Sequence, residues 1–237
     1  MTGGPGRAAE RDKVALITAA GNGIGAATAR AFAAAGYRLV LADVDADGPA
    51  RTAGTLSATT VIADLTDEVG AATAVSRAVE AHGQLDVLVN VVGGSRPGRT
   101  VPELDRAEWD RWVALNLTSV FLMCREALPY LVRSRGSVVN VSSGAGIRGM
   151  RANPAYCAAK AGVVGLTRAM AIDHGPQGVR INCVAPGPVR TPLMARNRTP
   201  EEIAAMGDIA VLGRIGEPEE VAAAILWLAG PSASYVT

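Results

Sequence analysis

Short apolar runs alternate with longer helical patterns along most of the chain. Six runs are rich in Val, Leu, Ile or Thr on both faces, as in parallel strands covered on two sides: residues 14–18, 38–43, 60–64, 85–89, 137–141 and 179–184. The spacing of apolar positions predicts five longer helices, over residues 23–35, 68–82, 108–134, 153–174 and 218–229. We expect Gly36 and Gly83 to end the first two helices and Pro129 to kink the third.

This alternation of strand and helix predicts an α/β fold with a doubly wound, Rossmann-like parallel sheet. Right-handed crossovers give the expected strand order 3-2-1-4-5-6. No linker-like composition interrupts residues 13–237, which are therefore expected to form one domain. Residues 1–12 are rich in Gly, Pro and Arg and lack the apolar segment of a signal peptide, so we expect a flexible tail there.

Composition narrows the classes of function. The formal net charge of +1 gives no reason to expect a nucleic acid or an anionic membrane as partner. Cys124, Cys157 and Cys183 have no metal-ligand spacing, so no metal is expected and the cysteines are interpreted as reduced thiols of a cytoplasmic protein. The apolar stretch 14–35 is interrupted by glycines and carries Arg30, which excludes it as a membrane span.

A glycine-rich turn, residues 18–25 with the sequence TAAGNGIG, connects the first strand to the first helix. Backbone N–H groups in such a turn can bind a pyrophosphate at the N-terminus of the helix. The candidate cofactor-binding residues of the turn are Gly21, Asn22, Gly23 and Ile24. A tight turn without a ligand would use the same glycines, and the position after the first strand is what favours the binding interpretation.

Two carboxylates end the second and third strands. Asp43 can accept hydrogen bonds from the ribose hydroxyls of NAD and would repel the 2′-phosphate of NADP. Because Asn22 and Val44 stand where an Arg or Lys could hold that phosphate, NAD is the predicted cofactor. Asp64 and the following Leu65 are candidate adenine-side contacts, although a helix N-cap or a turn carboxylate would also explain Asp64.

Tyr156 and Lys160 are spaced i, i+4 within the predicted helix 153–174, so their side chains share a face. An ammonium beside the phenol favours the phenolate, and we expect it to lower the pKa of Tyr156 from its usual value of about 10. Ser143, upstream of Tyr156, would hydrogen-bond the oxygen that gains or loses the proton. An isolated Tyr-x-x-x-Lys is more often an ordinary surface pair, so its interpretation as an acid/base device depends on the other motifs.

Together the motifs resemble the short-chain dehydrogenase/reductase family over essentially the whole chain. The family's Thr-Gly-x-x-x-Gly-x-Gly turn matches residues 18–25, and its Tyr-x-x-x-Lys signature matches Tyr156 to Lys160. The spacing to Tyr156 matches the family's catalytic Ser to Ser143 rather than to Ser142. Three further motifs match: the Asn-Asn-Ala-Gly segment at Asn90-Val91-Val92-Gly93, the helical Asn at Asn116, and the Pro-Gly segment at Pro186-Gly187-Pro188-Val189-Arg190-Thr191.

The resemblance implies hydride transfer between a nicotinamide and a carbon that bears oxygen, with Tyr156 as general acid/base. Lys160 would lower the pKa of Tyr156 and bind the nicotinamide ribose, Ser143 would polarise the substrate oxygen, and Asn116 would hold a water in a proton relay. Further cofactor contacts are implied for Asn90, Gly93, Pro186, Gly187, Val189 and Thr191, beside those of Tyr156 and Lys160. Residues 13–237 would then be a single dinucleotide-binding and catalytic domain.

The resemblance also implies a homotetramer that packs through the helices around Asn116 and Tyr156.

The sequence departs from the family's pattern at three places. Ala19 replaces the first glycine of the turn, which is tolerable at negative φ, and Val91 replaces an asparagine and removes a side-chain amide. The family usually continues after a segment like Tyr235-Val236-Thr237 with one more strand, and the sequence stops at Thr237, without that strand.

The expected function is the NAD-dependent interconversion of a secondary alcohol and a ketone. Reduction of 3-oxoacyl carriers, which normally suits NADPH, and a non-catalytic dinucleotide-sensing role are the alternatives. We expect the substrate pocket to be bounded by residues 94–99, 144–154 and 193–213, with the last segment as a mobile lid that contains a helix starting near Thr199. Met150, Leu193 and Met194 would form an apolar wall, and Arg148 or Arg151 could meet a carboxylate.

Overall fold

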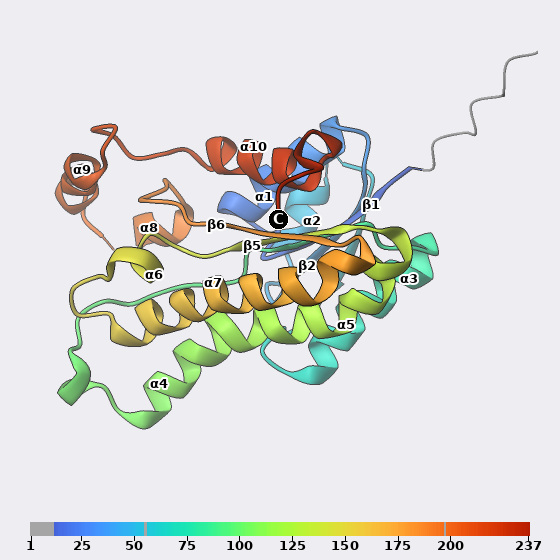
Figure 1. The fold of residues 1–237 in the computed structure, drawn as a ribbon. Helices are drawn as coiled ribbons and strands as arrows, with labels where there is room; N and C mark the ends of the chain where they lie inside the picture. The colour runs from blue at the N-terminus through green and yellow to red at the C-terminus, as the bar shows by residue number, and fades with distance from the viewer. Residues whose placement is uncertain (1–11, 55, 197) are drawn as a thin grey trace, which may run out of the picture.

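A computed structural model describes residues 12–54, 56–196 and 198–237 of the chain. Except for Asp12, the predicted tail 1–12 lies outside the described residues. The fold is a six-stranded parallel sheet with helices on both faces (Figure 1). Its strand order is β3-β2-β1-β4-β5-β6, which confirms the predicted doubly wound sheet. The strands are β1 (Val14–Thr18), β2 (Arg38–Asp43), β3 (Ala58–Ile62), β4 (Val87–Asn90), β5 (Ser137–Val141) and β6 (Arg180–Val184).

Three strands differ from their predicted bounds, and β6 does so by one residue at its start. β3 ends at Ile62, opposite Asp43, two residues before the predicted end. The reason is that Asp64 closes a turn, in which its carboxylate accepts hydrogen bonds from the backbone and the hydroxyl of Thr66. β4 begins at Val87 rather than Leu85. Asp86, the residue before it, accepts a hydrogen bond from the N–H of Val14 with its side chain.

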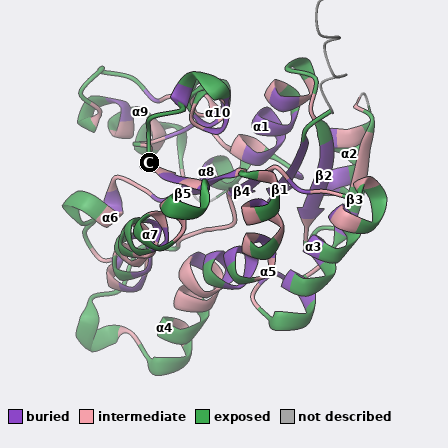
Figure 2. Cartoon of the chain, turned by 45° about the vertical axis from the view of Figure 1, so that its right-hand side comes forward, coloured by how far each residue is buried: buried purple, intermediate pink, exposed green. Residues whose placement is uncertain are grey.

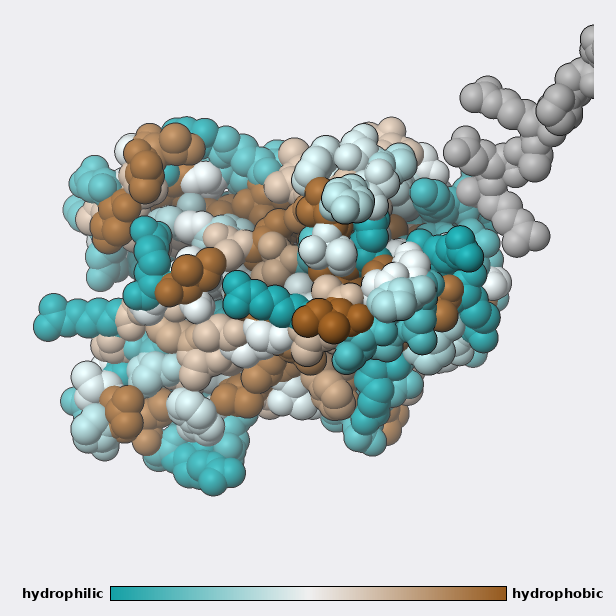
Figure 3. Space-filling model, in the orientation of Figure 1, coloured by the Kyte–Doolittle hydropathy of each residue, from teal (hydrophilic) through white to brown (hydrophobic). Residues whose placement is uncertain are grey.

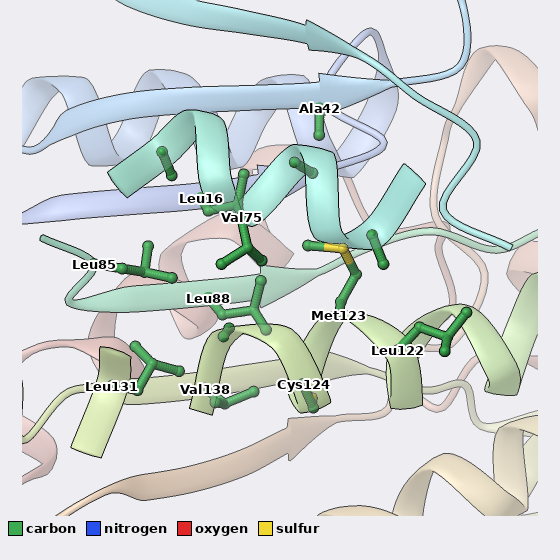
Figure 4. Close-up of a cluster of buried hydrophobic side chains, with 14 of the residues drawn as sticks. Leu16, Ala42, Val75, Leu85, Leu88, Leu122, Met123, Cys124, Leu131 and Val138 are labelled. Carbon is green, nitrogen blue, oxygen red and sulfur yellow. The ribbon is translucent and has the colours of Figure 1, made fainter. Parts of the chain in front are cut away.

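Alternate residues of each strand enter two separate cores, because successive side chains of a strand point to opposite faces. Val14 and Leu16 belong to the core under helices α3 (Glu68–His82), α5 (Ser119–Ser134) and α7 (Pro154–His174). This core includes Leu88, Met123 and Leu131 (Figure 4). Ala15 and Ile17 belong to the opposite core, under α1 (Gly23–Ala34) and α10 (Pro218–Ala229). Figure 2 shows the buried residues along the sheet and on the inner sides of these helices.

The predicted long helix 108–134 is interrupted. It consists of α4 (Arg106–Val113), a π-helical turn (Ala114–Thr118) and α5. The interruption surrounds Asn116, and α5 is continuous through Pro129, so the break lies N-terminal to the position of the predicted kink. Pi-helical turns insert one extra residue into a helix and are frequent at functional sites.

Short helices occupy the connections at one end of the sheet. They are α2 (Gly48–Ala53), α6 (Ala145–Arg148), α8 (Pro192–Arg196) and α9 (Pro200–Ile209), with a 3-10 turn at Val101–Glu103. Two further 3-10 turns lie at Gly175–Gln177, before β6, and at Pro231–Ala233, after α10. α9 begins as predicted, because Thr199 and Glu202 form a reciprocal capping box. Apolar residues are exposed around the end of α9, at Ile209, Val211 and Leu212. Brown atoms of the space-filling view gather in this region (Figure 3). No helix among the described residues combines the length and apolarity needed to cross a membrane.

Candidate active site at the carboxyl ends of the strands

Thr18, the last residue of β1, joins the first turn to the loop that follows β4. Its hydroxyl oxygen accepts hydrogen bonds from the N–H groups of Val91, at 2.9 Å, and Val92, at 3.3 Å. Val91 stands where the family has a second asparagine, and its backbone is held although the side-chain amide is absent. The loop after β4 is therefore fixed against the glycine-rich turn.

The glycine-rich turn has no room for side chains at two of its positions. A Cβ on Gly21 would lie 2.8 Å from both Asp43 Oδ2 and Gly48 Cα, and a Cβ on Gly25 would collide with the Ala19 carbonyl. Ala19 has a φ of +50°, so the condition under which an alanine is readily tolerated here, a negative φ, is not met. The alanine occupies a left-handed conformation that costs about 1–2 kcal/mol in a residue with a Cβ.

The N-terminus of α1 follows this turn directly. Its N-cap residue, Asn22, is extended, and its side chain makes no capping hydrogen bond. Gly23 lies opposite Thr191, whose Cγ2 would be 3.1 Å from a Cβ on the glycine. The bare backbone of the turn and the free helix N-terminus fit the pyrophosphate of a nicotinamide dinucleotide.

Asp43 faces the turn as predicted for a ribose ligand. Its Oδ2 accepts the N–H of Gly21 at 2.8 Å and its Oδ1 accepts the N–H of Asp45 at 3.1 Å. A cation not considered from the sequence lies nearby, because Arg51 pairs with Asp45 at 3.0 Å. This pair follows from the formation of α2, which the helical patterns did not predict.

Asp64 and Leu65 follow β3 at the same edge of the sheet. Of the two structural explanations for Asp64, a helix N-cap or a turn carboxylate, the structure shows the second. The N-cap of α3 is Asp67, which accepts the N–H of Gly70 at 2.7 Å. The Asp64 carboxylate uses Oδ1 for both of its bonds to Thr66. Leu65 is buried in the core, so only its backbone can face an adenine.

The side chain of Asn90 points away from the expected cofactor position. Its amide donates to Asn140 Oδ1 at 2.9 Å and to Cys124 Sγ at 3.3 Å, inside the core. Asn140 in turn donates to Thr167. Asn90 could therefore contact a cofactor only through its backbone, and its side chain joins β4 to β5.

Gly93 and Asn116 lie directly against Lys160. A Cβ on Gly93 would be 2.8 Å from Lys160 Nζ and 2.9 Å from Asn116 Oδ1. The side chain of Asn116 is fully buried and forms three hydrogen bonds: it accepts the N–H of Gly94 and donates to the carbonyls of Gly94 and Trp112. The π-helical turn therefore aims an amide at the loop after β4, next to the lysine.

Lys160 is almost completely buried, with 3% of its surface exposed. Its ammonium donates to the carbonyl of Val141 at 2.9 Å and lies 6.0 Å from the centre of the Tyr156 ring. The hydroxyl of Ser142 donates a hydrogen bond to the backbone carbonyl of Lys160, so this serine is bonded to the protein itself. Ser143 Oγ accepts the N–H of Ala145.

The pKa values of this pair differ from the sequence expectation. Burial raises the pKa of Tyr156, and the hydroxyl of Ser143 opposes that rise, so the expected lowering by Lys160 does not dominate. Burial also lowers the pKa of Lys160 to about 8. Because little water reaches the ammonium, its own charged form is destabilised, which the i, i+4 spacing could not reveal.

The segment 186–191 begins beside Ser143. The carbonyl of Pro186 accepts the N–H of Gly144 at 2.8 Å, which holds this segment to the end of β5. Val189 forms a parallel bridge with Gly216, and Gly187 is exposed. Thr191 Oγ1 accepts the N–H of Met194 at 3.3 Å and caps α8. The segment brings the predicted Pro186, Gly187, Val189 and Thr191 to the same side as Gly23.

The apolar wall has a different composition from the predicted one. Leu193 lies 3.6 Å from the Cβ position of Gly94, and Leu115 and Trp112 lie 3.7 and 4.0 Å from it. Trp112 and Leu115 were missed because the interrupted helix was not predicted. Met194, in contrast, is buried and does not form an exposed wall.

Among the described residues, no group of three or more His, Cys, Asp or Glu side chains has the arrangement of a metal site. The same stretch of sequence contains three free cysteines. The chemistry that this arrangement can perform is proton transfer at Tyr156, next to a dinucleotide-shaped cradle and an apolar wall.

Known proteins match the chain over most of its length. The family described as enoyl-(acyl carrier protein) reductase matches residues 18–237. The meso-2,3-butanediol dehydrogenase of Serratia marcescens is 40% identical, with 95% of this chain and 90% of that protein covered. The cis-4-hydroxycyclohexanecarboxylate dehydrogenase of Sinomonas cyclohexanicum is 42% identical, with coverages of 95% and 92%.

A solved structure is similar as well. The crystal structure of 3-ketoacyl-(acyl-carrier-protein) reductase from Brucella melitensis complexed with NADH has a TM-score of 0.89 and 33% identity. The match covers 95% of this chain and 93% of that one.

Proposed function

The chain belongs to the short-chain dehydrogenase/reductase family of oxidoreductases, and from that premise we propose that it interconverts secondary alcohols and ketones with NAD. The observation that carries the proposal is the contact of Gly93, Asn116 and Lys160 beside Tyr156, at the end of the site where Pro186 to Thr191 lie. Two similar proteins are alcohol dehydrogenases by name, and both match nearly the full chain.

In this proposal Tyr156 exchanges a proton with the substrate oxygen, and Ser143 orients that oxygen through its hydroxyl. When bound, the dinucleotide supplies the hydride acceptor and a positive charge that favours the phenolate. Lys160 holds the nicotinamide ribose through its ammonium, while the Val141 carbonyl fixes the position of the lysine. Asn116 also holds a relay water, which carries protons between Lys160 and solvent.

The preference for NAD over NADP rests on Asp43. Its carboxylate lies within hydrogen-bond distance of the Gly21 N–H, where it can accept the ribose hydroxyls and repel a 2′-phosphate. Arg51, on α2, is occupied by its ion pair with Asp45. Asp64 and the Leu65 backbone would contact the adenine, and Gly21 to Ile24 the pyrophosphate.

The experiment that tests the proposal follows NADH formation with a panel of secondary alcohols and NADH consumption with the corresponding ketones. We expect turnover with 2,3-butanediol or cyclic alcohols and a clear preference for NAD over NADP. A preference for NADP would overturn the cofactor assignment, and no turnover with any alcohol or ketone would overturn the function.

A second candidate function is reduction of 3-oxoacyl carriers, favoured by the matching family's description and by the similar reductase structure. An N-acetylcysteamine thioester of a 3-oxo acid, tested with NADPH and NADH, separates the two functions. A higher kcat/KM for that thioester than for any free ketone would favour the second function. A non-catalytic dinucleotide-sensing role would require the Tyr156–Lys160 pair to be dispensable.

We further propose a homotetramer in the cytoplasm, packed through α4, α5 and α7. A groove of about 550 Å³ separates α5 from α7, and apolar Phe121, Leu128, Leu166 and Met170 line it. Phe121 is 45% exposed, which suits burial against another copy. The three free cysteines support the cytoplasmic location. Light scattering after size exclusion tests the assembly, and a monomer mass would contradict it.

A further inference from the structure

Arg148 lies beside the catalytic serine segment. It is the last residue of α6, the helix that follows Ser143 and Gly144. Arg148 Nη2 lies 3.6 Å from the position that a Cβ would take on Gly144, and the Pro186 carbonyl oxygen lies 3.5 Å from the same position. Because residue 144 is a glycine, the guanidinium of Arg148 can lie over the backbone of Gly144, between Ser143 and Pro186.

The charge of Arg148 is not neutralised by an ion pair within the described part of the chain. None of the ion pairs between described residues includes Arg148. Two other arginines near the mouth of the site are paired: Arg99 with Asp105 and Glu108, and Arg190 with Glu217. The charges of those two arginines are compensated, whereas Arg148 is exposed and keeps its five donors for a ligand.

The part of the site over Gly94 is apolar. Leu193, Leu115 and Trp112 meet over Gly94, whose neighbour Gly93 touches Lys160. The loop after β4 is held to the start of α7 because the N–H groups of Gly98 and Arg99 both donate to the Ala152 carbonyl. The surroundings of Ser143 and Tyr156 therefore include the hydrocarbon over Gly94 and the guanidinium of Arg148 beside Gly144.

We propose that Arg148 binds a carboxylate of the substrate, so that the enzyme acts on hydroxy acids and their oxo acids with a hydrocarbon body. A guanidinium forms two parallel hydrogen bonds with a carboxylate, which orients the molecule as well as binding it. A phosphate monoester carries nearly twice the charge, and one exposed arginine matches a carboxylate better. This inference rests on the proposed alcohol dehydrogenase function and specifies its substrate class.

The test compares acids with their neutral esters. The probes are 3-hydroxybutyrate, 4-hydroxypentanoate and 5-hydroxyhexanoate, each beside its methyl ester, with 2,3-butanediol as a substrate that has no carboxylate. For the best chain length, we expect kcat/KM of the acid to exceed that of the ester by tenfold or more. Arg148→Gln should remove this preference and leave kcat/KM for 2,3-butanediol within about twofold of wild type.

Arg151→Gln is the matched control, because Arg151 is also exposed and outside the ion pairs of the described residues, but no contact places it at Gly144. It should keep the acid-to-ester ratio of the wild type. Arg148→Lys should keep part of the ratio, since the charge remains but the paired donors are lost.

Inhibition provides a second measurement that does not require the acids to react. Butyrate should compete with 2,3-butanediol in the wild type and at least tenfold more weakly in Arg148→Gln. An acid-to-ester ratio near one in the wild type, or an unchanged ratio in Arg148→Gln, overturns this inference while oxidation of 2,3-butanediol leaves the proposed function in place. Failure of every alcohol with both dinucleotides overturns the proposed function as well.

Discussion

At the proposed adenosine end of the site, the candidate ligand-binding groups are backbone N–H groups and the carboxylates of Asp43 and Asp64, close to solvent. At the proposed catalytic end, the lysine ammonium and the Asn116 amide are buried and already bonded to the protein. The first end can adjust to its ligand at low cost, because water replaces any lost bond. The second end is fixed before a ligand arrives, and displacement of one group leaves another buried without a partner.

The largest effect should come from the group that moves the proton. Tyr156→Phe removes the phenolic oxygen and keeps the ring, so we expect kcat to fall by about 10³-fold or more while NAD binding survives. Steady-state kinetics and a fluorescence titration with NADH measure the two quantities. A variant with a tenth or more of the wild-type rate would refute the role of Tyr156.

The next effect should come from the contact that fixes the lysine. Gly93→Ala places a methyl group 2.8 Å from Lys160 Nζ, which must shift, and we expect kcat/KM to fall by about 10- to 100-fold. Gly165→Ala, on the same helix as Lys160, is the control because its Cβ would meet no atom within 4 Å. Equal activity in the two variants would show that the catalytic end tolerates displacement.

The burial of Lys160 should appear in the pH dependence of stability. Its pKa is about 8 in the folded protein, whereas an exposed lysine has a pKa of 10.5, so the unfolded chain binds more protons between these values. The free energy of unfolding should therefore rise with pH across that window, by up to about 3 kcal/mol, relative to Lys160→Met. Urea unfolding at pH 7 to 10.5 measures it, and parallel curves for the two proteins would argue against a depressed pKa.

The smallest effect should arise at the adenosine end. Ala19→Gly relieves a left-handed alanine but increases the entropy of the unfolded chain, which leaves a net gain of about 0.5–1 kcal/mol. Thermal unfolding should show a rise in Tm of about 1–4 °C. Ala20→Gly, a neighbouring buried alanine without a positive φ, should lower Tm instead. A decrease of Tm in Ala19→Gly as well would mean that the alanine is unstrained.

The sheet could be predicted from the sequence because strands such as 14–18 are apolar on both faces, which only a doubly covered parallel sheet buries. The position of Asp43 was predictable too, since it depends on where one strand ends. The Asn116 turn was not predictable, because the bonds that hold it reach Gly94, which is distant in the sequence. Local periodicity carries no information about such a contact.

The remaining errors have the same origin. The direction of the Asn90 side chain is decided by Asn140 and Cys124, on a neighbouring strand and a helix. The raised pKa of Tyr156 is decided by burial, which follows from the packing of the whole site. The proximity of Arg148 to Gly144 required the short helix α6, which has too few residues for a periodic pattern.

The hydroxyl of Thr18 connects the two ends of the site. Thr18 leads from β1 into the turn at Ala19, and its hydroxyl holds the N–H groups of Val91 and Val92, just before the glycine that touches Lys160. We therefore expect movement of the turn to reach the lysine through the Thr18 side chain and the peptide units of Val91 and Val92. Affinity for the dinucleotide and alignment of the proton-transfer groups are consequently not independent traits, and any change that loosens position 18 would alter both at once.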